Sequence, residues 1–225
     1  MKFYDLHVNI TDLDKLEEVI RLAEKMEYSG IGLTVKDMSQ LKKLREKAKK
    51  IKTSLDLVFC AEIQAEGVKQ MKRDVSKFRK EADVILVFGG EYNINRAAAE
   101  DERVDIISHP EYRRRDSGLD EIIARSAAEK GVAIEVNFHE ILETYRKIRS
   151  HVLYHISKNI EICKKYKTPV VITSDSIDKW TMRDPRQLAS IGQILGMGLK
   201  DSMESVSKVP ENIVGKNRRK LENYE

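Results

Sequence analysis

The chain has 225 residues, of which 41% are hydrophobic and 35% charged, and its formal net charge is +4. A chain of this length and hydrophobic fraction can bury one large core or two small ones. The near balance of acidic and basic residues excludes a strongly basic tail of the histone kind, so any basic surface must arise from local clustering.

The first residues show neither an export signal nor a membrane anchor. Lys2 and Asp5 interrupt the start of the chain, and the longest strongly apolar run, Val84–Phe88, is far shorter than the ~20 residues that span a bilayer. Cys60 and Cys163 lie far apart and form no C-x-x-C pair. Cys60 lies inside an apolar strand-like run, which favours a buried reduced thiol. We therefore expect a soluble, cytoplasmic protein.

Short apolar runs alternate with longer amphipathic segments along the chain. Runs as continuously apolar as these are typical of parallel strands that are covered on both faces. The predicted strands are Phe3–Val8, Gly30–Val35, Leu55–Ile63, Val84–Phe88, Val104–Ser108, Val132–Phe138 and Pro169–Thr173.

The segments between these runs show the apolar spacing of helices. A first helix begins near Thr11 and runs to about Glu27, and Asp184 followed by Pro185 is a favourable start for a helix to about Leu195. The other predicted helices cover Leu41–Ile51, Glu66–Lys80, Ile94–Glu100, Leu119–Lys130 and Glu140–Tyr166, the last of which is long enough to be two helices.

Strand–helix units repeated in series predict parallel strands with right-handed crossovers. An open doubly wound sheet and a closed barrel both fit this order. No G-x-G-x-x-G follows the first strand, which disfavours the dinucleotide-binding sheet, so we favour a TIM-like parallel βα barrel of about seven strands. We expect this α/β barrel to fill residues 1–213 as a single domain, followed by a basic, flexible tail at 214–225. The final stretch as a whole, Lys200–Glu225, is polar and basic and is either a short helical wrap or a partly ordered tail.

Polar residues gather where the predicted strands end, which is where functional groups meet in a barrel. A buried carboxylate or imidazole is costly unless it is paired or bound to metal, so these positions indicate either a satisfied internal network or the mouth of a site. They are His7, Asn9, Glu62, Gln64, Glu91, Asn95, His109, Glu135, Asn137, Ser174 and Asp175.

These strand ends resemble, in order, the metal-binding motifs of the polymerase-and-histidinol-phosphatase (PHP) superfamily, whose active members hold metal ions that hydrolyse phosphate esters. The motifs are Asp5-Leu6-His7-Val8-Asn9, Ala61-Glu62-Ile63, Ser108-His109-Pro110, Glu135-Val136-Asn137 and Thr173-Ser174-Asp175-Ser176. Asn9 replaces the second histidine of the opening motif, and Ser176-Ile177 stands where the superfamily has a closing histidine. Because asparagine and serine are poor ligands beside imidazole and carboxylate, the resemblance implies a vestigial site without bound metal at His7, Asn9, Glu62, His109, Glu135 and Asp175.

A PHP-like barrel with an eroded metal site resembles the ribonuclease P protein component 3 family, the archaeal and eukaryotic thirty-kilodalton subunits. The resemblance runs from Tyr4 to about Ile213, and the compact length resembles the archaeal members. It implies a subunit of ribonuclease P, the endoribonuclease that generates the 5′ ends of tRNAs, and a chain that is not catalytic alone. The implied partners are ribonuclease P RNA, precursor tRNA, component 2 and the other protein subunits. The chain itself needs no cofactor, since the RNA holds the catalytic magnesium.

Basic residues cluster in several segments that would suit RNA. Arg113, Arg114 and Arg115 are adjacent in the loop after the fifth predicted strand, where guanidinium groups repel one another unless an anion meets them. The candidate RNA contacts are Arg96, Arg113, Arg114, Arg115, Lys179, Arg183, Lys42 and Lys43. A lysine-rich helix interleaved with glutamate is often only a solvated face, and this interpretation stays open for Lys36–Lys52. With 6% aromatic residues, no platform for stacking bases is visible.

Two other functions stay open on the sequence. A metal-dependent phosphoesterase of the PHP type would use His7, Glu62, His109, Glu135 and Asp175 to hold an ion. A scaffold would use the barrel for protein contacts alone. His151 and His155, four residues apart on one helix face, are a weaker candidate for a metal site.

Overall fold

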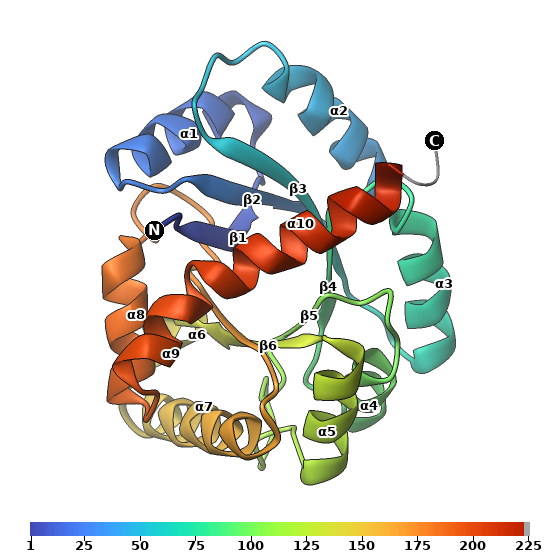
Figure 1. The fold of residues 1–225 in the computed structure, drawn as a ribbon, viewed down its shortest axis with the longest axis vertical. Coiled ribbons are helices and arrows are strands. Elements are labelled where there is room, and N and C mark those ends of the chain that lie inside the picture. The colour runs from blue at the N-terminus through green and yellow to red at the C-terminus, as the bar shows by residue number, and fades with distance from the viewer. Residues whose placement is uncertain (223–225) are drawn as a thin grey trace.

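The computed structural model describes the backbone of residues 1–222 and the side chains of residues 1–219. Within them, parallel strands pair in chain order and form a nearly closed barrel that helices surround (Figure 1). The strands are β1 (Tyr4–Asn9), β2 (Gly30–Val35), β3 (Asp56–Ile63), β4 (Val84–Phe88), β5 (Ile106–Ser108), β6 (Ala133–Asn137) and β7 (Val170–Thr173). Beyond the end of β7, the Ser176 carbonyl accepts from the Asn9 amide at 2.8 Å and links the last segment to the first. The predicted TIM-like barrel is confirmed.

Five of the α-helices begin where the sequence provides a side-chain cap. Asp37, Glu91, Asp120, Asn137 and Asp184 each accept a hydrogen bond from the first turn of the helix that follows. The helices are η1 (Leu13–Lys15), α1 (Leu16–Lys25), α2 (Met38–Ala48), α3 (Val68–Phe78), α4 (Tyr92–Ala99), α5 (Glu121–Lys130), α6 (Phe138–Glu143), α7 (Arg146–Tyr166), α8 (Pro185–Ile194), α9 (Leu199–Ser205) and α10 (Lys208–Glu222). Among them, none is long and apolar enough to cross a membrane.

The barrel interior is apolar near the N-terminal ends of the strands and polar near their C-terminal ends. On β3, Val58 and Cys60 belong to the interior apolar cluster, and the next residue on the same face is Glu62. On β6, Ala133 belongs to that cluster and Glu135 follows on the same face. Successive side chains point to opposite faces of a strand, so the next inward-facing residue lies two positions further along. On these strands that residue is polar and lies beyond the apolar core. We call the polar end the mouth of the barrel.

Helix α10 crosses the other end of the barrel (Figure 1). Its Ile213 and Val214 join the interior apolar cluster, and Asn217 Nδ2 donates to the Asp83 carbonyl at 2.9 Å. Arg218 Nη1 donates to Asp56 Oδ1 at 2.8 Å. The flexible tail that we expected at 214–225 is therefore wrong for residues 214–222, which are helical. We expected a tail because most of this segment is polar and basic, although a few of its side chains pack against the barrel. Residues 223–225 lie outside the described part of the chain.

Candidate functional site

A buried imidazole lies at the centre of the mouth, among three carboxylates. His7 Nδ1 is 2.7 Å from Glu135 Oε1, and His7 Nε2 is 3.2 Å from Asp175 Oδ1 and 3.5 Å from Glu62 Oε1. All four side chains are less than a tenth exposed. β1, β3, β6 and the turn after β7 deliver them because these strands end together at the mouth.

A second imidazole completes the network on the side of β5. His109 lies 3.0 Å from Glu140 Oε2 through Nδ1 and 3.2 Å from Asp175 Oδ2 through Nε2. Phe88 stacks on its ring at a centroid distance of 4.7 Å. The backbone φ values of His109 and Asp175 are both +48°, in the left-handed region that residues with a β-carbon rarely adopt. Strained backbone at both positions holds the two side chains toward each other.

Two asparagines occupy ligand-like positions in the same network. Asn9 Nδ2 donates to Asp175 Oδ1 at 2.5 Å, and Asn137 Nδ2 donates to Glu135 Oε2 and Asp175 Oδ2 at 3.1 and 3.0 Å. An amide NH₂ group donates to carboxylates, whereas a metal ligand must accept. These contacts stabilise the carboxylates as a metal ion would, through hydrogen bonds instead of coordination.

The two imidazoles and the carboxylates hold each other ionised. Burial would lower the pKa of His7, but Glu135, Asp175 and Glu62 together raise this pKa to about 9. Burial opposes the charge on His109 as well, and its contacts with Asp175 and Glu140 still raise its pKa. Burial would raise the pKa of Glu135 and Asp175, and the facing imidazolium groups lower both. At neutral pH the mouth therefore contains a network of paired ions.

The donor atoms that remain could close around one metal ion at most. Ligand atoms of His7, His109 and Glu135 lie within 4.8 Å of one another. Each of these residues is already engaged by an oppositely charged neighbour in the network, and the described residues present Asn9 and Ser176 where further ligands would be needed. Asparagine here donates, so it does not fit a cation. The residues do not fit the ion cluster of the PHP superfamily.

Several other polar strand ends shape the surrounding loops. Glu91 caps α4 through the amides of Asn93 and Ile94. Buried Asn95 donates through Nδ2 to the carbonyls of Pro110 and Gly118, at 3.0 and 2.9 Å. Gln64 lines a cavity of about 600 Å³ at the mouth, together with Asn9, His109 and Asp175. The Ser174 amide donates to Asp5 at 3.2 Å.

The arginine loop, residues 109–118, leaves the mouth directly after His109. Arg113 and Arg115 are exposed, and Arg113 lies over the Tyr112 ring at 5.1 Å. Arg114 is instead held by Asp116 Oδ1 at 2.5 Å and by the Gly90 carbonyl at 3.0 Å. The repulsion expected among three adjacent guanidinium groups is thus reduced within the protein. Arg114 is paired with Asp116 and holds the loop in place, and the other two arginines face solvent.

The other basic candidates differ in how free their charges are. Lys179 pairs with Glu18 at 2.7 Å, and Arg183 donates to the carbonyls of Trp180 and Met182. Arg96 lies within α4, in the helix predicted over Ile94–Glu100, and it pairs with Glu100 at 3.1 Å. Lys42 and Lys43 are exposed on α2 and form no ion pair with the described residues.

Sequence reasoning missed several side chains that complete the mouth. Glu140 lies at the start of α6, not at a strand end, and binds His109. Lys36, counted only in a charge run, reaches Glu62 Oε2 at 3.1 Å. Thr173 and Ser108 donate to Glu135 and Glu62, at 2.7 and 2.9 Å. Thr173 and Ser108 could have been found from the sequence, because each lies at an inward-facing position near the end of its strand.

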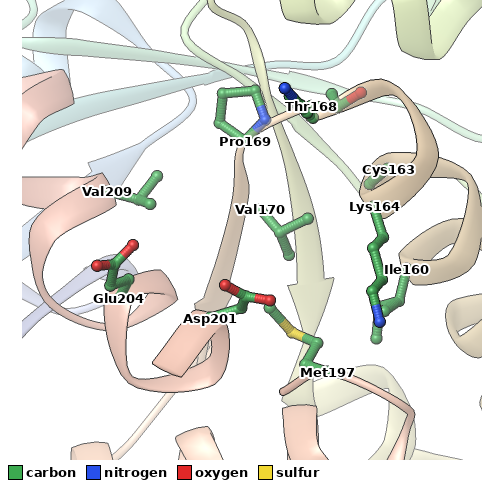
Figure 2. Close-up of a pocket in the computed structure, with 11 residues that line it drawn as sticks. Ile160, Cys163, Lys164, Thr168, Pro169, Val170, Met197, Asp201, Glu204 and Val209 are labelled. Carbon is green, nitrogen blue, oxygen red and sulfur yellow. The ribbon is translucent and has the colours of Figure 1, made fainter. Parts of the chain in front are cut away.

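A different hollow of about 400 Å³ lies at the opposite end of β7 (Figure 2). Lys164 and Asp201 line it from α7 and α9, and Thr168 and Val170 line it from the start of the strand. Cys163 borders it, and burial raises the pKa of this thiol to about 12, so it stays protonated. Cys60 and Cys163 are both buried free thiols, which confirms the prediction for Cys60.

Comparison with known proteins decides the family. A family model described as RNase P subunit p30 matches residues 2–222. The chain belongs to the RNase P subunit p30 family. Ribonuclease P protein component 3 of Methanocaldococcus jannaschii is 35% identical to this family member over 208 residues, which cover 91% of this chain and 89% of that protein. Its counterpart from Methanothermobacter thermautotrophicus is 30% identical over 219 residues, covering 95% and 89%.

Solved structures agree with the assignment to the RNase P subunit p30 family. A chain in the cryo-EM structure of archaeal ribonuclease P with mature tRNA matches with a TM-score of 0.80 at 30% identity, covering 94% of this chain and 90% of that one. Histidinol phosphate phosphatase from Lactococcus lactis matches with a TM-score of 0.55 at 12% identity, covering 89% and 94%, and shares the barrel fold. The predicted family is confirmed, and the subunit interpretation is favoured over the phosphoesterase.

Proposed function

We propose that this protein supports the RNA of ribonuclease P during 5′-end maturation of precursor tRNA, by neutralising phosphates and stabilising RNA structure. Its partners are ribonuclease P RNA, precursor tRNA and the other protein subunits, component 2 among them. The RNA supplies the magnesium site and the hydrolysis. The observation that carries the proposal is a PHP-like barrel whose mouth is filled by paired ions, in a member of the RNase P subunit p30 family.

The mouth is poorly suited to hydrolysis by the chain alone. A hydrolase of this superfamily needs carboxylates and imidazoles with free lone pairs for metal and water. Here the Asp175 carboxylate is shared by His7, His109, Asn9 and Asn137. These contacts stabilise the fold of the mouth and leave the phosphate chemistry to another molecule.

The arginine loop is the best-placed RNA contact. Arg113 and Arg115 are exposed beside the mouth, and they form no ion pair with the described residues. Neutralising an RNA phosphate releases counterions without first breaking a protein salt bridge. Lys179, Arg183 and Arg96 would have to exchange existing contacts, so we rank their contribution lower.

The test is precursor-tRNA cleavage at limiting magnesium, by cognate ribonuclease P RNA with component 2, with and without this chain. We expect the chain to raise the cleavage rate or to lower the magnesium requirement. Arg113→Ala combined with Arg115→Ala should remove most of that gain, while circular dichroism and the melting temperature stay unchanged.

The matched control is Arg73→Ala combined with Arg125→Ala, two exposed arginines on α3 and α5. This control should retain the full gain. If the chain adds nothing while component 2 is shown to be functional, the proposed function is wrong. Equal losses in the two double variants would instead remove the assignment to the arginine loop.

A further inference from the structure

A second cavity adjoins the mouth and shares His109 and Glu140 with the ionic network described above. This side cavity has a volume of about 520 Å³ and lies between the arginine loop, α6 and the first half of α7. Tyr112, His139 and His151 supply aromatic walls, and Ile148 and Val152 supply apolar ones. The volume is in the range of small-molecule sites.

Polar atoms without partners lie in the walls of the side cavity. Glu111 is 3% exposed, and its Oε1 has no hydrogen-bond partner among the described residues. Its other oxygen accepts from Asn159 Nδ2 at 3.4 Å. His139 Nδ1 is likewise buried without a partner. Buried polar atoms left unpaired are costly, so such atoms beside a cavity indicate a ligand that supplies the missing hydrogen bonds.

Arg113 lines the side cavity, and Arg146 and Lys147 lie at the start of α7, just before the lining residue Ile148. We call these three cations the rim of the side cavity. Arg113 on the loop and Arg146 at the start of α7 have φ values of +53° and +52°. Both are exposed, as is Lys147, and none of the three forms an ion pair with the described residues. Residues with a β-carbon are held in this region only where the surrounding structure imposes it, and such positions concentrate at functional sites. This cationic rim lies beside an interior that is aromatic and apolar and also contains the carboxyl groups of Glu111, Glu140 and Glu143. The arrangement suits an anionic chain that inserts an uncharged ring bearing a hydrogen-bond donor.

We propose that the side cavity binds one unpaired RNA nucleotide that carries an exocyclic amino group on its base, with the base inside and its phosphate on the rim. Glu111 Oε1 accepts from the amino group, as carboxyl oxygens do in base recognition. Burial raises the pKa of Glu111 to about 8, and a donated hydrogen bond from the base favours its ionised form. Tyr112, His139 and His151 contact the faces of the base, because unpaired bases stack on aromatic side chains. Arg113 and Arg146 hold the phosphate. This inference rests on the proposed RNA-binding function and names the feature of the RNA that is bound.

A photo-crosslinking residue at position 148 tests the proposal in the reconstituted ribonuclease P complex. Ile148 lines the cavity and is 60% exposed, so the replacement does not disturb the core. We expect a crosslink to a single unpaired nucleotide, and sequencing tells whether ribonuclease P RNA or precursor tRNA provides it. The same crosslinker in place of Ile194, which is 77% exposed on α8, is the matched control and should give no such product. A crosslink from position 148 to a protein subunit, or to paired RNA only, would overturn the inference.

Ile148→Trp provides an independent measurement by filling the entrance. We expect the captured nucleotide to become at least several-fold more reactive toward a 2′-hydroxyl acylating reagent in the complex, and Ile194→Trp to leave its reactivity unchanged. Glu111→Gln should weaken protection of that nucleotide when the protein is folded by its melting curve. If the reactivity is unchanged in Ile148→Trp while the cleavage gain still depends on Arg113 and Arg115, nucleotide binding in the side cavity is refuted and the proposed function is not. Loss of both effects would refute RNA binding at this end altogether.

Discussion

The charge of His7 decides whether the carboxylates around it can all stay ionised. Its pKa is about 9 in the folded protein, against an ordinary value of 6.5. The stabilisation that its protonation provides is therefore fully present below pH 6.5 and is lost as pH rises from 6.5 through 9. A shift of this size corresponds to a few kcal/mol in the free energy of unfolding.

This dependence is testable by urea unfolding at a series of pH values. The wild-type protein should lose stability between pH 6.5 and 9. His7→Gln should be less stable at pH 6.5 and show a flatter profile over the same window, since it lacks the titration of His7 and retains only those of His109 and Glu111. His151→Gln, at an exposed position on α7, serves as control and should follow the wild type. A wild-type profile that is level across this window would contradict the charged state of the network.

The contacts among these residues predict that the isolated protein holds no structural metal ion at the mouth. Because donor atoms at the mouth are engaged by neighbouring ions and amides, a chelator should leave the melting temperature of the isolated protein unchanged. Added zinc or manganese should raise it by no more than a degree or so. Stoichiometric metal retained through purification, with a clear drop in the melting temperature on chelation, would show instead that His7, His109 and Glu135 hold an ion.

At the scale of elements, α4 positions the arginine loop through one buried side chain. Asn95 Nδ2 binds the carbonyls of Pro110 and Gly118, at the two ends of the segment that contains Arg113. Asn95→Ala would leave both carbonyls unpaired and should cost roughly 1–3 kcal/mol of stability. The freed loop should be cut faster by trypsin after Arg113 or Arg115.

Asn93→Ala is the matched control for this experiment. Asn93 lies on the same helix, is exposed, and its side chain contacts only Glu91 among the described residues. It should change neither the stability nor the cutting rate by a measurable amount. Equal trypsin sensitivity in the two variants would mean that Asn95 does not restrain the loop.

Most elements could be predicted because their signals are local. The apolar runs gave Gly30–Val35 and Val84–Phe88 with the bounds that the structure has, and Asp184-Pro185 marked the start of α8. The split of the long helix into α6 and α7 was left open, and the structure places it at Thr144 and Tyr145, whose backbones are extended. Helix α10 was left open between a helical wrap and a partly ordered tail, because the residues that pack with Ile213 and Val214 are spread along the chain from Tyr4 on β1 to Val171 on β7.

The mouth could be predicted in outline but not in its pairings. Motif order placed His7, His109, Glu135 and Asp175 together, since parallel strands end at one edge. It could not show that Arg114 is bound by Asp116 or that Lys179 is bound by Glu18, because side-chain pairing across loops leaves no periodic trace. It also missed Trp180, which is 76% exposed beside Lys179 and is an aromatic surface available to a partner.

At the scale of the whole molecule, the charge is nearly balanced, so RNA affinity must come from where the cations lie. Each phosphate contact contributes about 0.9 to the slope of log affinity against log salt for a duplex. In the holoenzyme, Arg113→Ala with Arg115→Ala should make that slope shallower by about one unit per arginine, measured by RNA binding between 50 and 200 mM salt.

Lys42→Ala with Lys43→Ala removes equal charge from the outer surface of α2. This pair should change the slope less if α2 is a solvated face. A larger effect from the lysines than from the arginines would move the main RNA contact to α2 and away from the mouth.

The position of α10 also bears on how the chain is made. Its apolar residues complete the interior against Tyr4 and Val84, so a segment synthesised after all seven strands covers the first one. Until α10 leaves the ribosome, one end of the barrel interior is open to water, and pairing of such distant segments is slow. A nascent chain stalled before residue 208 should therefore expose this interior to chaperones, and emergence of α10 becomes the step that commits the barrel to its folded state.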